Sequence, residues 1–209
     1  MGVACLAGPV VACAFAYPTD LFFENLVPTF HVCDSKILNE NQKQESREGL
    51  LKLCQQGALF GIGEASVEEI DSLNIYHATG LAMERAFEKI ANNLRGHSTQ
   101  VFIDGNRVPP RLRSGNEDLF GSENENLKLW PEYSADWLIK GDQKSFAVAA
   151  ASILAKTTRD TLMKKLHEDF PGFGWNTNVG YPTETHRAGL TLQGPNQHHR
   201  KSFRLNYNT

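Results

Sequence analysis

Residues 145–170, SFAVAAASILAKTTRDTLMKKLHEDF, carry the strongest secondary-structure signal in the chain. The stretch begins with small side chains that allow close packing, and Leu162 and Leu166 then lie one helical turn apart. Pro171 follows its end, where a proline stops a helix. The sequence therefore predicts a long helix here, with Asp160 in its second half.

Three apolar stretches earlier in the chain are predicted as strands: residues 10–17, 58–64 and 100–104. The first is apolar throughout, which is typical of a strand buried on both faces. After the second, a capping box at residues 66–69 (SVEE) predicts a helix that ends at Gly96. This alternation of strands and helices predicts an α/β domain. It does not give the order of the strands.

The composition is that of an ordinary globular protein. The chain has 209 residues, of which 41% are hydrophobic and 22% charged, and these values exclude disordered, collagenous and coiled-coil classes. The length fits one domain, spanning residues 1–209. Residues 107–128 are rich in Pro, Gly, Asn and acids without a sustained period, so we expect a long surface loop there.

The protein is expected to be cytoplasmic, with no membrane segment. The apolar residues 3–16 lack a positive flank and contain Gly8-Pro9, which favours a buried strand over a signal peptide or membrane span. Four cysteines fall in the first quarter of the chain without a C-x-x-C pair. Neither a zinc site nor a disulfide framework is indicated, and free thiols in a reducing compartment are expected.

Charge is distributed unevenly. Residues 1–139 contain 11 basic and 19 acidic side chains, whereas residues 140–209 contain 10 and 5. The net charge of −3 excludes a chain that is basic all over, but it leaves room for a local cationic face. An uneven surface charge without function is the alternative.

The basic third could follow a phosphate backbone, with aromatic rings of Trp175, Tyr181 and His186 placed to stack or to position a sugar. The alternative is a solvated helix face and a basic tail. The candidate cations are Lys140, Lys144, Lys156, Arg159, Lys164, Lys165, Arg187, Arg200, Lys201 and Arg204.

Two acids are candidates for metal ligation. Asp104 ends a predicted strand, at the sheet edge where open α/β sheets bind ligands, and Asp160 lies in the alanine-rich helix. Carboxylates of this kind hold Mg²⁺ together with water and substrate phosphate oxygens. The alternatives are a turn acceptor for Asp104, and for Asp160 an ion pair with Lys156 or Lys164 on the same helical face.

Motifs along nearly the whole chain resemble the ribonuclease HII family, a type 2 ribonuclease H. The most specific is AAASILAK (149–156) followed by Arg159-Asp160. The others, in the family's order, are Gly8-Pro9-Val10-Val11, Asp34-Ser35-Lys36, Glu69-Ile70-Asp71 with Ala82-Met83, Asp104-Gly105-Asn106, Lys140-Gly141-Asp142, Gly180-Tyr181 with Thr183, and His199-Arg200 with Ser202-Phe203.

The resemblance implies an RNase H-like α/β fold, with a central mixed sheet flanked by helices and a helical carboxyl-terminal portion. It also implies an endoribonuclease that hydrolyses RNA in RNA/DNA hybrids and incises 5′ of ribonucleotides embedded in duplex DNA. Mg²⁺ or Mn²⁺ would be the cofactor, and the products would carry 5′-phosphate and 3′-hydroxyl ends. A monomer is expected.

The resemblance also implies site residues. Asp104 and Asp160 match two of the family's four catalytic, metal-binding acids. Tyr181 matches the tyrosine that packs on the sugar beside the scissile phosphate, and Lys36 is expected near substrate phosphates. Asn178-Val179 replaces the usual His-Lys, which removes an expected phosphate contact.

The start of the chain matches only part of the family's opening motif, D-E-x-G-R-G-x-L-A-G-P. Residues 1–9 match it from the third position, so the other two acids, an Asp-Glu pair ending the first strand, fall before Met1. Gly2, Val3 and Ala4 stand where G-R-G contacts the ribose 2′-hydroxyl through its backbone.

Three interpretations therefore remain open. The chain is an active endoribonuclease, or it binds hybrid duplex without cutting it, as a degenerate or amino-terminally shortened relative, or its start site is misassigned. Without the first strand, we expect its neighbours to have unpaired backbone groups.

Overall fold

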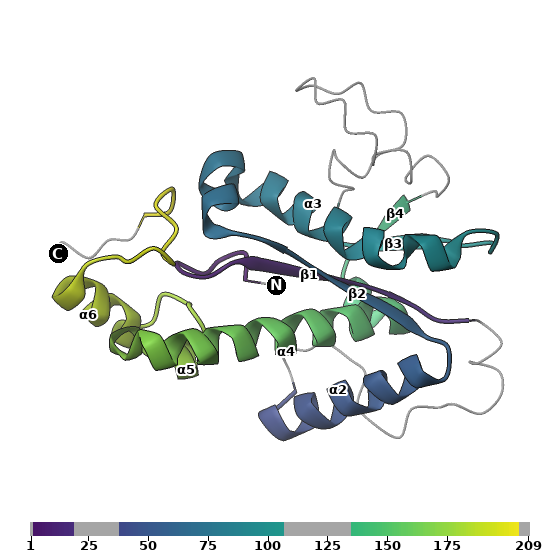
Figure 1. Ribbon diagram of the computed structural model, residues 1–209, viewed down its shortest axis with the longest axis horizontal. Coiled ribbons are helices and arrows are strands. Elements are labelled where there is room, and N and C mark those ends of the chain that lie inside the picture. The colour runs from purple at the N-terminus through teal and green to yellow at the C-terminus, as the bar shows by residue number, and fades with distance from the viewer. Residues whose placement is uncertain (1, 19–37, 107–134, 205–209) are drawn as a thin grey trace.

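The computed structural model describes residues 2–18, 38–106 and 135–204. Within these ranges the strands form two separate two-stranded sheets (Figure 1). Strand β1 (Val10–Ala16) pairs antiparallel with β2 (Leu59–Ala65), and β3 (Val101–Asp104) pairs parallel with β4 (Ala135–Leu138). Both pairing directions are therefore present, but the mixed sheet expected from the resemblance is divided into two pairs.

Helices make up most of the described structure. The predicted long helix at 145–170 is α4 (Phe146–Asp169), and the helix predicted from the capping box is α3 (Val67–Leu94). The remaining helices and 3-10 turns are α2 (Glu40–Gln55), η3 (Gly141–Gln143), η4 (Pro171–Phe173), α5 (Trp175–Asn178) and α6 (Glu184–Gln193). None of the described helices is long and apolar enough to cross a lipid bilayer.

Helix α3 covers one face of both sheets. Its Phe87 and Ile90 belong to an apolar cluster that contains Ile103 of β3, and Ala14 of β1 packs against this cluster. The capping box at its start is present, because Ser66 Oγ accepts from the Glu69 N–H and the Glu69 carboxylate accepts from the Ser66 N–H. One helix thus fixes the two strand pairs relative to each other.

Helix α4 covers the opposite face of β1. Ala150, Ile153 and Leu154 are at most 1% exposed and pack with Phe15 of β1 and Leu50 of α2. The small residues early in α4 let the helix approach the strand closely, as the sequence predicted. Asp160 lies farther along the same helix.

Arg159, next to Asp160 in α4, is buried and bonded only to backbone in the structure. Its Nε donates to Pro9 O at 3.0 Å, Nη2 to Ala7 O at 2.9 Å and Nη1 to Val179 O at 2.8 Å. Its exposed fraction is 1%. One guanidinium therefore joins the first residues of the chain, a loop near residue 180 and α4.

Arg200 repeats this arrangement from the other side. It is fully buried, and its donors meet Gly8 O at 2.8 and 3.0 Å and Val3 O at 3.0 Å. Burial lowers its pKa to about 10, so it remains charged at neutral pH. Arg159 and Arg200, the arginine pair, were expected among cations facing phosphates. That expectation is wrong for both, because carbonyl oxygens inside the protein accept their hydrogen bonds.

The helical carboxyl-terminal portion packs around Trp175, His186 and His199, which we call the histidine cluster. All three are fully buried. Trp175 Nε1 donates to His186 Nε2 at 3.2 Å, and His186 Nε2 lies 3.1 Å from His199 Nε2. The expectation that Trp175 and His186 stack on nucleic acid is therefore wrong, since neither ring reaches the surface.

Replacing Arg200 by Met should lower the free energy of unfolding by on the order of 3 kcal/mol, because buried carbonyl oxygens lose charged donors and cannot reach water. Urea denaturation followed by circular dichroism measures this. Arg95→Met, at an exposed arginine beyond α3, is the control and should change stability by less than about 0.5 kcal/mol. Equal losses in the two variants would contradict the role given to Arg200.

The histidine cluster should make stability fall with decreasing pH. Burial lowers the pKa of His186, and burial followed by the proximity of His186 lowers that of His199 to about 4. Between pH 6.5 and 4 the unfolded chain thus binds protons that the folded chain does not, so folding is penalised as the pH falls.

Denaturation midpoints across that pH range measure the effect. The slope of unfolding free energy against pH should be smaller in His199→Gln than in the wild type. His97→Gln, at an exposed histidine, should keep the wild-type slope. An unchanged slope in His199→Gln would exclude His199 as the source.

Candidate active site

Asp160 lies in α4 with 10% of its side chain exposed. Both of its carboxylate oxygens accept from the Lys156 ammonium, one turn earlier, at 2.5 Å. The ion pair with Lys156 considered from the sequence is thus present, whereas Lys164 pairs with Glu40 of α2 instead. In this structure the Lys156 ammonium is thus the cation that pairs with the Asp160 carboxylate, as a bound metal ion would be.

Asp104 is the last residue of β3, and its backbone continues into an exposed turn. Its Oδ1 accepts from the Gly141 N–H at 2.9 Å. Lys140 just before Gly141 has φ of 56°, a left-handed conformation that turns the chain at this point. Asp104 is therefore held from the η3 turn rather than by the local turn into residues 105–106 that the sequence allowed.

Tyr181 stands on a loop with unusual backbone geometry. Val179 has φ of 43° and Gly180 has φ of 89°. A left-handed conformation is strained for a β-branched residue such as Val179 and persists only where the surroundings enforce it. Arg159 holds the Val179 carbonyl, and Leu6 N–H donates to the Gly180 carbonyl at 2.8 Å. Tyr181 itself is 38% exposed.

The start of the chain lies against the same loop. Gly2 is buried, and a Cβ on it would lie 2.1 Å from Arg159 Nε, so only glycine fits there. Val3 and Ala4 are exposed. Cys5 Sγ donates to the Val179 carbonyl oxygen at 3.9 Å, in the loop just before Tyr181.

Burial, with Cys5 as the next cause, raises the pKa of the Tyr181 phenol, which therefore stays protonated at neutral pH. Asp160 is near enough to act on that phenol electrostatically. Gly2 and the loop that carries Tyr181 thus both lie against Arg159, the neighbour of Asp160 in α4.

Of the other predicted site residues, Asp104 is not part of the group of residues around Arg159. Asp104 lies on the second strand pair, and Lys36 falls outside the described residues. Across residues 2–18, 38–106 and 135–204, no three His, Cys, Asp or Glu side chains gather closely enough to form a metal site. The two acids are therefore supported by different parts of the fold.

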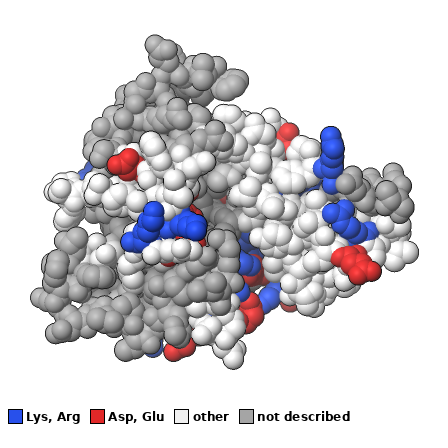
Figure 2. Space-filling view, turned by 180° about the vertical axis from the view of Figure 1, so that it is seen from behind, with Lys and Arg blue, Asp and Glu red and all other residues white. Residues whose placement is uncertain are grey.

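Cations are scattered over the surface. Figure 2 shows Lys and Arg in separate small groups on one face, accompanied by acidic side chains, rather than as one continuous field. The exposed members of the predicted phosphate contacts are Lys140, Lys144, Lys164, Lys165, Lys201 and Arg204, of which Lys164 is paired with Glu40. A phosphate backbone would meet these side chains and not the arginine pair.

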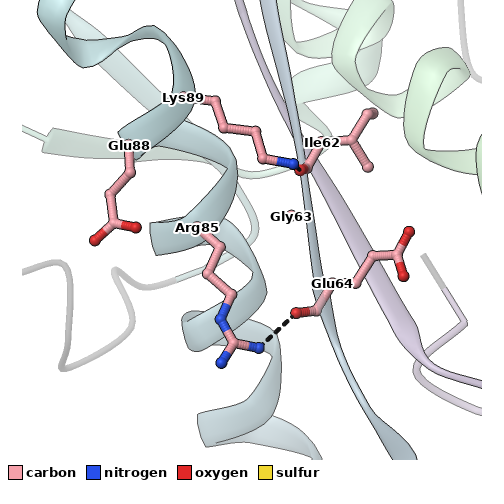
Figure 3. Close-up of a pocket in the computed structure, with 6 residues that line it drawn as sticks. All are labelled: Ile62, Gly63, Glu64, Arg85, Glu88 and Lys89. Carbon is pink, nitrogen blue, oxygen red and sulfur yellow. Dashed lines mark hydrogen bonds between the residues drawn. The ribbon is translucent and has the colours of Figure 1, made fainter.

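A hollow of about 500 Å³ lies between β2 and α3 (Figure 3). Arg85, which lines it, donates to Glu64 O at 2.8 Å and pairs with Glu69, and Lys89 donates to Ile62 O. The cationic groups of the hollow therefore bond carbonyls along β2. No predicted site residue lines it, so it is separate from the group around Arg159.

Several residues hold this site through contacts that were not predicted from the sequence. His186 Nδ1 lies 2.9 Å from Tyr181 O, and Asn178 Oδ1 accepts from the Gly180 N–H at 2.9 Å. Gly141 was considered only as part of the motif Lys140-Gly141-Asp142, and its N–H holds Asp104. The motif around residue 180 marks the loop, but no local pattern indicates which distant side chains would hold it.

Comparison with known proteins agrees with the resemblance seen in the sequence. Ribonuclease HII of Christiangramia forsetii is 38% identical over 205 residues, covering 98% of this chain and 87% of the relative. Ribonuclease HII of Bacteroides fragilis is 39% identical over 204 residues, covering 98% and 86%.

Solved structures share the fold. The complex of PCNA with ribonuclease HII from Archaeoglobus fulgidus matches with a TM-score of 0.65 and 22% identity, covering 100% of this chain and 94% of that one. Ribonuclease H2 from Pyrococcus horikoshii matches with a TM-score of 0.61 and 21% identity, covering 98% and 91%. The α/β, RNase H-like fold is thereby confirmed. The family model of ribonuclease HII matches residues 1–209, and the chain belongs to the ribonuclease HII family.

Proposed function

We propose that the protein is an endoribonuclease that hydrolyses RNA in RNA/DNA hybrids and incises 5′ of ribonucleotides embedded in duplex DNA. The observation that carries the proposal is the convergence of three groups around Arg159. These are the exposed residues Val3 and Ala4, the half-exposed Tyr181, and the Asp160 carboxylate. Membership of the ribonuclease HII family supports it.

Each of these groups would make a different contact with the substrate. Backbone groups at residues 2–4 would hydrogen-bond the ribose 2′-hydroxyl, which distinguishes RNA from DNA. The Tyr181 ring would pack on the adjacent sugar, and its neutral phenol avoids repulsion from phosphate. The fixed loop below Tyr181 reduces the entropy lost when a substrate is bound.

Asp104 and Asp160 are the proposed metal ligands, for Mg²⁺ or Mn²⁺. Their oxygens are the donors that these ions prefer, and one or two carboxylates complete a site together with water and substrate phosphates. A bound divalent ion would supply Lewis acidity at the scissile phosphate. Asp160 becomes available when the flexible Lys156 side chain moves away, and Lys156 can then pair with a substrate phosphate instead.

We also propose that residues 1–209 form one domain that acts as a monomer in the cytoplasm, with Lys36 near substrate phosphates. The described cysteines Cys5, Cys13 and Cys54 are free thiols, which suits a reducing compartment.

Cleavage by the purified 209-residue chain tests the proposal. The substrates are an RNA/DNA hybrid and a DNA duplex with one ribonucleotide, each with Mg²⁺ or Mn²⁺. We expect 5′-phosphate and 3′-hydroxyl products. Asp104→Asn should lower the rate about 10²-fold or more, since metal stabilisation of the transition state is worth several kcal/mol. Asp136→Asn, at an exposed aspartate on β4, is the matched control and should retain activity.

Binding of the same duplexes separates the remaining outcomes. A chain that binds the ribonucleotide-containing duplex selectively but does not cut it would overturn the endonuclease proposal in favour of a hybrid-binding protein. Cleavage that survives Asp104→Asn unchanged would remove Asp104 from the site.

A further inference from the structure

We propose that His186 is the positioning residue for Tyr181, and that its Nδ1–H group thereby sets how well the protein distinguishes a ribonucleotide from a deoxyribonucleotide. The inference rests on the proposed function, because it assigns the contact that places the Tyr181 ring. It follows from the hydrogen bonds of the histidine cluster.

The neighbours of His186 determine its tautomer. Trp175 Nε1 can only donate a hydrogen bond, and it lies 3.2 Å from His186 Nε2. His186 Nε2 must therefore be the acceptor, and the proton of the neutral ring is on Nδ1. His199 Nε2 also lies 3.1 Å from this atom, and His199 Nδ1 lies 3.0 Å from the Asn196 nitrogen and 2.9 Å from Asn196 Oδ1. The Trp175 donor is therefore the contact that fixes the tautomer of His186.

This tautomer directs a donor at Tyr181. His186 Nδ1 lies 2.9 Å from the Tyr181 carbonyl oxygen, which also accepts from the Thr183 N–H at 2.8 Å. The Tyr181 N–H in turn donates to Asn178 O at 2.8 Å. The backbone of Tyr181 is thus bonded on both sides, although its ring is 38% exposed.

The loop needs such a restraint because it is strained. Val179, two residues earlier, has φ of 43°, a left-handed conformation that persists in a β-branched residue only where the surroundings enforce it. Arg159 holds the loop at Val179, before Tyr181 in the chain. His186 holds it at Tyr181 itself, and it is fully buried, so its own position is fixed by packing. Without the Nδ1–H donor, the ring at the surface would lose part of its fixed placement.

Two substitutions separate the functional contact from packing. His186→Asn places an amide N–H near the position of Nδ1 and can still donate to Tyr181 O. His186→Gln reaches toward Trp175 and His199 but lacks a donor at the Nδ1 position. Both variants alter the buried cluster, so a purely structural role would affect them alike.

The measurement is the ratio of dissociation constants for an all-DNA duplex and the same duplex with one ribonucleotide, by fluorescence anisotropy in EDTA. His186→Gln should lower this ratio about 10-fold, the equivalent of one lost hydrogen bond, whereas His186→Asn should stay within about 3-fold of the wild type. In a Tyr181→Ala background, His186→Gln should have no further effect, because the two side chains act through one contact. His97→Gln is the control.

Equal loss of the ratio in His186→Gln and His186→Asn would overturn the inference, and so would a further loss in the Tyr181→Ala background. A wild-type ratio of one would overturn the proposed function and this inference with it. A test without substitutions is the ¹⁵N NMR tautomer pattern of His186 in the wild-type protein. We expect a protonated Nδ1, and a protonated Nε2 would overturn the inference even if the variants do not fold.

Discussion

The arrangement of the site depends on the two buried guanidinium groups of the arginine pair. Burying a charge is costly unless it is hydrogen-bonded, and here each side-chain nitrogen of both arginines donates to a carbonyl oxygen of residues 3–9 or of Val179. These carbonyls belong to a segment with little secondary structure of its own. Arg159 and Arg200 therefore act in place of a strand ladder, and they bring the start of the chain to a helix and a tail that lie more than 140 residues later.

The two acids of the site are held by different means, and this affects how firmly each is placed. Asp160 is carried by α4, whose small residues pack directly on β1 and α2. Asp104 lies at the end of a four-residue strand, restrained by the Gly141 N–H and by the packing of Ile103 beneath α3. The position of Asp104 relative to Asp160 therefore depends on the apolar packing beneath both α3 and α4.

Local sequence patterns predicted most of the helices and strands. The features that were not predicted depend on contacts between residues far apart in the sequence. The helix predicted for 145–170 is α4 (Phe146–Asp169), because its periodicity and the proline after it are local signals. Strand β4 was missed, since it is four residues long and becomes a strand only through pairing with β3. Arg159, Arg200 and His186 were expected at the surface because charged and polar side chains are rarely buried. Their partners lie far away in sequence, so no local pattern marks the exception.

The same buried polar network links stability to the placement of Tyr181, the proposed sugar contact. An apolar core would be less sensitive to pH than the histidine cluster, and apolar side chains could replace the arginine pair without a desolvation cost. An apolar side chain in either place could not donate a hydrogen bond to a carbonyl oxygen. The strained loop at Val179 is restrained by two such hydrogen bonds, from Arg159 to the Val179 carbonyl and from His186 to the Tyr181 carbonyl. Because Tyr181 lies at the exposed end of that loop, the orientation of its ring is fixed by groups that never reach the solvent. An apolar side chain in place of either donor would therefore take a hydrogen bond away from a carbonyl oxygen of this loop, and it would lower stability and weaken the hold on Tyr181 together.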